Sequence, residues 1–94
     1  MSRIYKYPLQ LTEQQKINMP TGAKVIHVAV QREAICLWAI VDPDQPVESR
    51  SFGILGTGQP DFNPKEMRHL VSVLMSDVTF GWHVFEPSDP KELR

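Results

Sequence analysis

Proline and glycine constrain this fold more than any other sequence feature, because they divide the chain into short segments. The 94 residues include 8 prolines and 5 glycines. A proline inside a helix removes a hydrogen bond and clashes with the preceding turn. Most of the segments between these breaks are about 8–12 residues long, which is the spacing of strands and turns. We therefore expect a mainly β fold: a small antiparallel sheet, a sandwich or a partly open barrel of six to seven short strands.

Two neighbouring apolar runs give the clearest strand signal. Val25–Val30 is rich in β-branched residues, which pack well on a pleated sheet. Ala34–Val41 is apolar throughout, which favours a central strand covered on both faces. The polar residues Gln31–Glu33 between them predict an antiparallel hairpin, with a loop of roughly three to five residues because Asn-Gly and Asp-Gly are absent. Alternation along the first strand places His27 on the same face as Val25.

Shorter segments complete the predicted sheet. Ile4–Tyr7 is expected to form an edge strand that Pro8 ends, and Lys16–Met19 alternates as a half-buried strand does. Ser51–Leu55 predicts a strand whose glycine marks a bulge or a close backbone approach. Val78–Phe85 predicts the last strand. Beyond it, residues 87–94 are polar and are expected to fray.

The segment 63–75 fits two structures. Asn63–Glu66 (Asn-Pro-Lys-Glu) is typical of a helix start, and four apolar residues follow at the i, i+3, i+4 and i+7 positions of a helix. Leu70–Met75 is equally acceptable as a strand. The pattern alone leaves open at most one short helix here, or another strand.

Composition excludes several classes of function. The net charge of −1 argues against a disordered acidic tail and against a dedicated nucleic-acid binder. The single cysteine, Cys36, lies in the most apolar run, which favours a buried thiol over a nucleophile. No apolar run approaches the roughly 20 residues of a membrane span, and the first residues lack a signal-peptide core. We expect a single soluble domain over residues 1–94.

No pattern of catalytic or metal-binding residues stands out. Gly56–Gly58 (Gly-Thr-Gly) is the one phosphate-like motif, since neighbouring glycines let backbone N–H groups converge on an anion. It completes neither the Walker nor the dinucleotide pattern, so a plain turn is the leading interpretation. His27, His69 and His83 lack compact metal-ligand spacing, and no Gly-x-Ser-x-Gly elbow occurs. We expect no enzymatic activity, no metal and no cofactor.

Several segments together point to a family. They are Ile4–Leu9, Ile17–Ala23, Cys36–Pro43, Arg50–Phe52, Gly56–Gly58 and Trp82–Glu86, in that order. The chain resembles, over nearly its whole length, a family of short, uncharacterised proteins encoded mainly by bacteriophages and prophages. This resemblance favours a strand at Leu70–Met75. It also implies an accessory protein made in the cytoplasm of a bacterial host, and it carries over no catalytic residue.

These observations favour a non-enzymatic binding protein that modulates a host process. It is expected to inhibit a bacterial defence system by binding a host protein or by sequestering a small nucleotide signal. The alternative is a structural role as a virion accessory or assembly protein. Membranes and nucleic acids are not expected as partners, whereas a homo-oligomer is compatible with the pattern. The candidate ligand- or partner-binding residues are Tyr5, Tyr7, Arg50, Gly56, Thr57, Gly58, Trp82 and His83.

Overall fold

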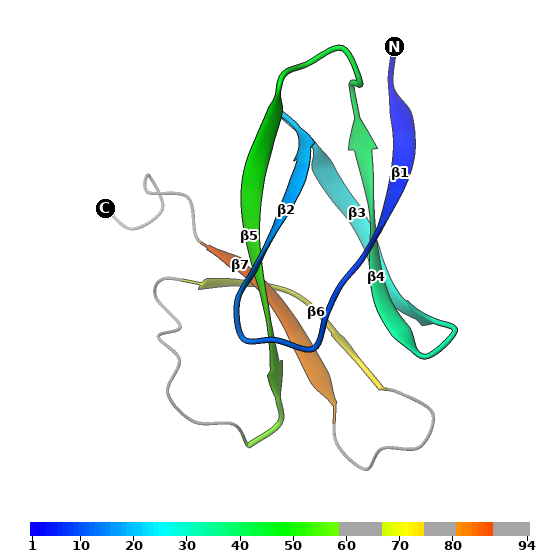
Figure 1. Cartoon of the computed structure of the whole chain (residues 1–94). Helices are drawn as coiled ribbons and strands as arrows, with labels where there is room; N and C mark the ends of the chain where they lie inside the picture. The colour runs from blue at the N-terminus through cyan, green and yellow to red at the C-terminus, as the bar shows by residue number, and fades with distance from the viewer. Residues whose placement is uncertain (59–66, 75–80, 88–94) are drawn as a thin grey trace.

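Seven antiparallel strands in two sheets make up the part of the chain that the computed structural model describes, residues 1–58, 67–74 and 81–87 (Figure 1). The three-stranded sheet has the order β1-β4-β3 and the four-stranded sheet the order β2-β5-β7-β6. The predicted mainly β class is confirmed, and these strands do not close into a barrel. The strands are β1 (Arg3–Pro8), β2 (Gln15–Pro20), β3 (Lys24–Gln31), β4 (Ala34–Val41), β5 (Val47–Gly56), β6 (Met67–Val73) and β7 (Trp82–Pro87).

The most apolar run forms the central strand of the three-stranded sheet, as its pattern predicts. β4 pairs with β1 on one side and with β3 on the other. On its inner face Ile35, Leu37 and Ala39 are at most 1% exposed, since alternate residues of a strand share a face. The outer face is covered less completely, because Cys36 is buried but Ile40 is 37% exposed.

The β3–β4 hairpin has a tighter turn than the expected loop of three to five residues. Gln31 pairs directly with Ala34, so only Arg32 and Glu33 connect the strands. Their φ angles are 51° and 64°, and positive φ at both central residues is the mark of a type I′ turn, whose twist matches that of the strands. The prediction was wrong because it required asparagine or glycine. Instead, the pairing of the two strands holds Arg32 and Glu33 at positive φ, although this conformation is unfavourable for them.

A bulge in β3 places His27 on the face opposite to Val25. The register passes from Val25↔Ala39 to His27↔Trp38, with Ile26 as the extra residue. His27 therefore lies on the outer face, where its ring centroid is 5.4 Å from that of Trp38. Val25 packs against the core. The predicted shared face is wrong, because a single extra residue reverses the alternation.

Strand β6 decides between the two structures considered for segment 63–75. It pairs antiparallel with β7 from Met67↔Pro87 to Val73↔Trp82, so the helix alternative is wrong over Met67–Val73. Sheet pairing satisfies the backbone and gives the apolar residues of this segment neighbours on β7. Residues 63–66 lie outside the described part of the chain. Within that part, no helix is long and apolar enough to cross a membrane.

The last strand, β7, covers Trp82–Phe85 of its prediction and continues to Pro87. β7 begins at Trp82, and residues 78–80 of the predicted strand lie outside the described residues. Pro87 was expected to belong to the frayed tail, but it is the last residue of β7. Residues 88–94 of that tail also lie outside the described residues.

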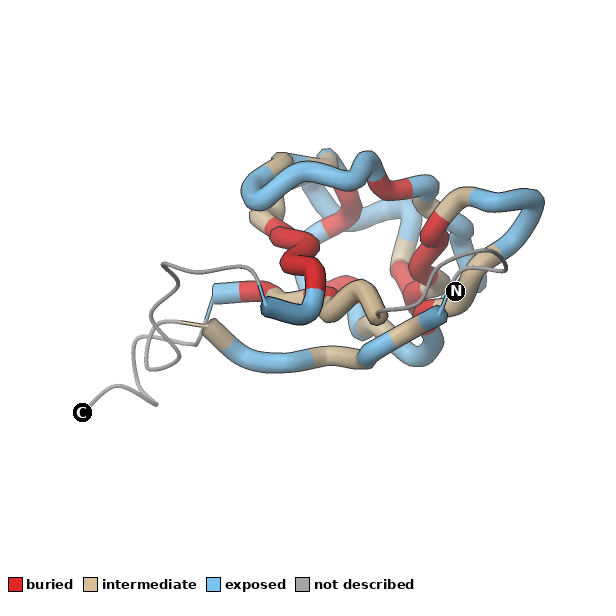
Figure 2. Tube along the Cα trace, turned by 90° about the horizontal axis from the view of Figure 1, so that it is seen from below, coloured by how far each residue is buried: buried red, intermediate tan, exposed pale blue. Residues whose placement is uncertain are grey.

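One apolar core receives side chains from both sheets. Leu37 and Val28 come from the three-stranded sheet, and Phe52, Ile54 and Val84 come from the four-stranded sheet. Figure 2 shows the buried residues in several separate stretches of the chain. The two sheets pack face to face on this shared core, so the core determines which residues of one sheet lie near residues of the other.

The connection between β1 and β2 runs beside β5. The amide of Ile54 donates to the carbonyl oxygen of Thr12 over 2.9 Å. A Cβ atom at Gly53 would lie only 2.3 Å from the carbonyl oxygen of Glu13. The glycine in this strand therefore marks a close backbone approach, one of the two roles that the sequence predicted.

Candidate functional site

The eight predicted residues fall into three groups in the structure. Tyr5 and Tyr7 lie on β1, in the three-stranded sheet. Arg50 lies in β5, where it faces the space between the two sheets. A third group gathers where β5 ends and β7 begins, and it consists of Gly56, Thr57, Gly58, Trp82 and His83.

The two tyrosines lie on the same face of β1 but differ in burial, because Tyr5 is exposed and Tyr7 is half-buried. Tyr5 pairs with Ala39 and Tyr7 with Leu37, so both follow the inner face, and Tyr7 packs against the core. Their ring centroids are 6.4 Å apart. Burial raises the pKa of Tyr7 above its ordinary value of 10.0, and the nearby Tyr5 raises it further.

Arg50 lines a hollow of about 330 Å³ between the two sheets. This volume is at the lower end of the range for small-molecule sites, about 300–1,000 Å³. The wall contains residues at the start of β3 and on β5, β6 and β7: Ala23, Lys24, Val25, Arg50, Arg68, Leu70 and Glu86. Strands distant in sequence therefore build one site.

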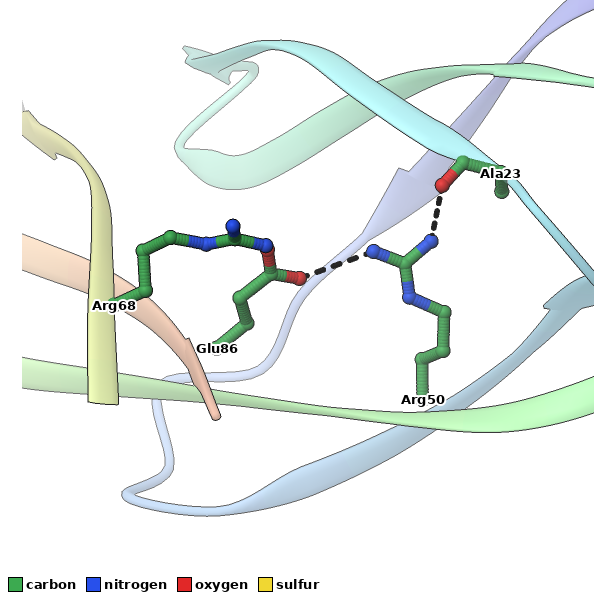
Figure 3. A network of polar contacts seen from close by, with 4 residues as sticks. All are labelled: Ala23, Arg50, Arg68 and Glu86. Carbon is green, nitrogen blue, oxygen red and sulfur yellow. Dashed lines mark hydrogen bonds and ion pairs between the residues drawn. The ribbon is translucent and has the colours of Figure 1, made fainter. Parts of the chain in front are cut away.

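A buried carboxylate joins two arginines in this hollow (Figure 3). Glu86 Oε2 accepts a hydrogen bond from Arg50 Nη2 over 3.0 Å, and Glu86 Oε1 accepts one from Arg68 Nη2. Arg50 Nη1 also donates to the carbonyl oxygen of Ala23. The Glu86 side chain is only 8% exposed, against 22% for Arg50 and 49% for Arg68. A carboxylate can be buried here because each of its oxygens has a cationic partner.

The described residues that line the hollow carry an excess of positive charge. Among them three are basic, Lys24, Arg50 and Arg68, and one is acidic, Glu86. Both oxygens of that carboxylate are engaged by the arginines. This excess of positive charge favours anions over cations near the hollow.

A second polar chain links β5, β7 and β6 on the outer face of the four-stranded sheet. Thr57 Oγ1 lies 2.7 Å from His83 Nε2, and His83 Nδ1 lies 2.6 Å from Ser72 Oγ. Ser72 Oγ lies 2.9 Å from His69 Nε2. Because Val84 belongs to the core, the neighbouring His83 points away from it. Unlike the hollow, this chain of contacts contains no carboxylate and no arginine.

The Gly-Thr-Gly segment is tied down as a turn. The Thr57 amide donates to the Gly81 carbonyl oxygen over 3.1 Å, so this N–H group is not directed at a ligand. Gly56 pairs with Trp82 at the end of the β5–β7 ladder. Gly58 has φ of 86°, a conformation that favours glycine. The turn interpretation accounts for these contacts.

The three histidines do not meet. His69 and His83 have ring centroids 6.3 Å apart, whereas His27 contacts Trp38 in the other sheet. Among the described residues, no group of three or more His, Cys, Asp or Glu side chains is placed to hold a metal ion.

The sequence profile of DUF7352, a domain of unknown function, matches residues 1–94. The chain belongs to this family. Neither a curated protein nor a solved structure matches it. Membership in DUF7352 agrees with the expected uncharacterised family.

In this DUF7352 chain, segments that carry the family resemblance contact each other. Arg50 meets Glu86 across β5 and β7, and Thr57 meets His83. Sequence reasoning selected Arg50 and His83 but missed Arg68, Ser72 and Glu86. The one signal for these residues in the sequence was Glu86 itself. It is a carboxylate directly after an apolar run, where a charge needs a partner. The partners come from other strands, so local patterns do not show them.

Proposed function

We propose that this DUF7352 chain is a phage-encoded, non-enzymatic binding protein that sequesters a small nucleotide signal of its bacterial host. The hollow between the sheets would hold the phosphate groups. The observation that carries this proposal is the excess of two positive charges on the described residues that line that hollow, of which three are basic and one is acidic. A phosphate-bearing ligand supplies the missing negative charge.

The two arginine side chains are better suited to bind phosphate than the point charge of a lysine ammonium group would be. A guanidinium group has five N–H donors in a planar fork, which can bind two oxygens of one phosphate. Arg50 uses one donor on Ala23 and one on Glu86, and its guanidinium carbon lies 5.8 Å from the centroid of the Phe52 ring. These contacts fix the fork before a ligand arrives, which lowers the entropic cost of binding.

The rest of the wall suits the less polar part of a nucleotide. Val25 and Leu70 line the hollow beside the charged groups. A few fixed polar groups beside an apolar wall are typical of small-molecule sites. The host and the defence-related role rest on the resemblance to phage proteins, and a sequestering protein in such a host needs binding without chemistry.

Calorimetric titration tests this function. Cyclic dinucleotides and ADP-ribose derivatives form the panel, with pyrophosphate as the minimal probe. We expect saturable heat for at least one nucleotide, and weaker binding at high salt because charges are screened. Arg68→Gln should weaken binding about tenfold, the effect of losing one charge-assisted hydrogen bond. Lys16→Gln, on the exposed part of β2, is the control and should bind like the wild type.

Two results would contradict the proposal. One is the absence of heat across the whole panel with folded protein. The other is equal affinity of Arg68→Gln and the wild type, which would place any bound nucleotide outside the hollow. Circular dichroism of each variant separates a loss of binding from a loss of folding.

An apolar face favours a second candidate function, that of a virion accessory or assembly protein. On the outer face of the three-stranded sheet Ile4 pairs with Ile40, and both are exposed, as is Ile26 at the neighbouring bulge. Clustered exposed apolar residues are typical of contacts between proteins. Detection of the chain in purified particles, and its loss from them in Ile4→Glu, would support this role over sequestration.

A further inference from the structure

Ser72 lies between two imidazole rings on the outer face of the four-stranded sheet. Its Oγ atom is 2.6 Å from His83 Nδ1 and 2.9 Å from His69 Nε2. Ser72 is exposed, so a small molecule can reach the hydroxyl group. These residues are separate from those that line the hollow, so the chemistry of Ser72 is independent of the proposed function.

The hydrogen bonds along this chain have a preferred direction. The carbonyl oxygen of Gly81 only accepts, and Thr57 Oγ1 lies 3.3 Å from it. If the Thr57 hydroxyl donates there, its oxygen accepts from His83 Nε2–H, which leaves Nδ1 of a neutral ring unprotonated. Nδ1 then accepts the proton of the Ser72 hydroxyl, and Ser72 Oγ accepts from His69 Nε2–H.

The reverse assignment leads to the same result for the serine. If His83 carries its proton on Nδ1, that group donates to Ser72 Oγ, and the Ser72 hydroxyl donates to His69 Nε2. In both arrangements the hydroxyl proton points at an imidazole nitrogen while the other ring donates to the oxygen. A serine next to a base that a third group orients is the general signature of an activated nucleophile.

We propose that Ser72 is an activated nucleophile that accepts an acyl group from small activated esters. Ser72 Oγ attacks the carbonyl carbon, and its proton passes to His83 Nδ1. The bond from the carbonyl carbon to the leaving alkoxide or phenoxide breaks, and the leaving oxygen keeps the electron pair. The proton on His83 then passes to that oxygen or to water. The product is an ester at Ser72 Oγ, with no oxidant or reductant involved.

The two histidines have different parts in this step. In the arrangement in which Thr57 donates to the Gly81 carbonyl oxygen, His83 is the general base, and Thr57 positions its ring through the Nε2 contact. His69 Nε2–H donates to the serine oxygen and orients it toward the carbonyl carbon. The ring of His69 is held in turn by an edge contact with Phe85, at 5.3 Å between centroids.

Acetylation by p-nitrophenyl acetate tests the proposal, with the modified positions located by peptide mass mapping of the full chain. We expect Ser72 to be acetylated at least tenfold faster than Ser49, an exposed strand serine for which the described residues supply no histidine partner. His83→Gln should slow the reaction at Ser72 about a hundredfold, the lower end of the contribution of a general base. Ser72→Ala should lose the modification at this position.

The unaltered protein alone can overturn the proposal. If Ser72 of the wild type is not acetylated, or reacts no faster than Ser49, the serine is not activated. A folded His83→Gln variant that reacts at the wild-type rate would also contradict it. Because the wild-type comparison needs no substitution, the test holds even if a variant does not fold.

Discussion

The two sheets differ in what they bury. The three-stranded sheet turns an apolar inner face to the core, where Leu37 and Ala39 have no exposed surface. The four-stranded sheet also contributes to that core, but it carries the buried Glu86 with its two arginines on one face and the Ser72–His83 contact on the other. Most side chains of the two proposed sites therefore lie in the four-stranded sheet, whereas Lys24 comes from β3 of the other sheet.

This difference shows how a small domain can combine a stable core with polar sites. Domains of this size have only about 5–10 kcal/mol of stability, so a buried charge is tolerated only with partners. In this chain both sheets contribute buried apolar residues, and the four-stranded sheet also carries the buried Glu86 with its two arginine partners. Substitutions of the core-facing residues of β4 should change stability alone, and those of the Glu86 and Ser72 contacts should also change binding or reactivity.

Leu37→Ala should have the largest effect on stability. Leu37 is 0% exposed at the centre of β4, so its truncation leaves a cavity. We expect a loss of about 4 kcal/mol in the free energy of unfolding, within the range for buried leucines. Urea denaturation gives this value. A loss below about 1 kcal/mol would show that the core lies elsewhere.

Glu86→Gln should cost about 3 kcal/mol, since it removes the charge that separates two arginines. The hollow would then have a larger excess of positive charge. We therefore expect pyrophosphate to restore more stability to this variant than to the wild type, by linkage to binding. Thermal unfolding with and without pyrophosphate measures both effects. Glu48→Gln, an exposed position on β5, should change stability by less than about 0.5 kcal/mol and respond to pyrophosphate like the wild type.

The two-residue turn of the three-stranded sheet offers a stabilising change. Arg32→Asn combined with Glu33→Gly replaces two residues of positive φ with the pair that type I′ turns prefer. We expect a gain of about 1 kcal/mol in urea denaturation, with pyrophosphate binding unchanged. The control variant, with alanine at both positions, removes the same charges but keeps side chains at positions of unfavourable positive φ. An equal gain from the alanine variant would attribute the effect to charge.

Ionisation of Tyr7 should lower the free energy of unfolding at high pH. This is the smallest of the predicted effects. Burial raises the pKa of Tyr7 in the folded state, with a further contribution from Tyr5. The folded protein then holds this proton more tightly than the unfolded chain, so the stabilisation is complete below the unfolded pKa and is lost as the pH rises through the folded pKa. Denaturation at about pH 8 and about pH 11 should show a fall that Tyr7→Phe reduces and Tyr5→Phe reduces less. A fall equal in all three proteins would contradict this.

Local patterns in the sequence determined much of the fold. Proline and glycine spacing indicated the strand lengths, and the apolar run of β4 predicted its central place. The bulge at Ile26 and the turn at Arg32 were missed, because both depend on the register between strands rather than on residue type. A register shift of one residue changes every pairing after it.

The candidate sites were harder to predict than the strands. Arg50 and Glu86 are 36 positions apart, and Ser72 and His83 are 11 apart, so only strand pairing shows that they meet. Thr57 and His83 were each selected from their motifs. Their contact arises from the β5–β7 ladder, in which the neighbouring Gly56 pairs with Trp82.

The central claim, that the hollow and not the Gly-Thr-Gly turn receives an anion, is tested most directly by NMR. Pyrophosphate is added to the ¹⁵N-labelled protein, and the amide shifts of the assigned residues are followed. We predict saturable shifts for the amides of Lys24, Arg50 and Arg68, with those of Thr57 and Gly58 unchanged. Saturable shifts confined to Thr57 and Gly58, or no saturable shift at any of these positions, would contradict the account.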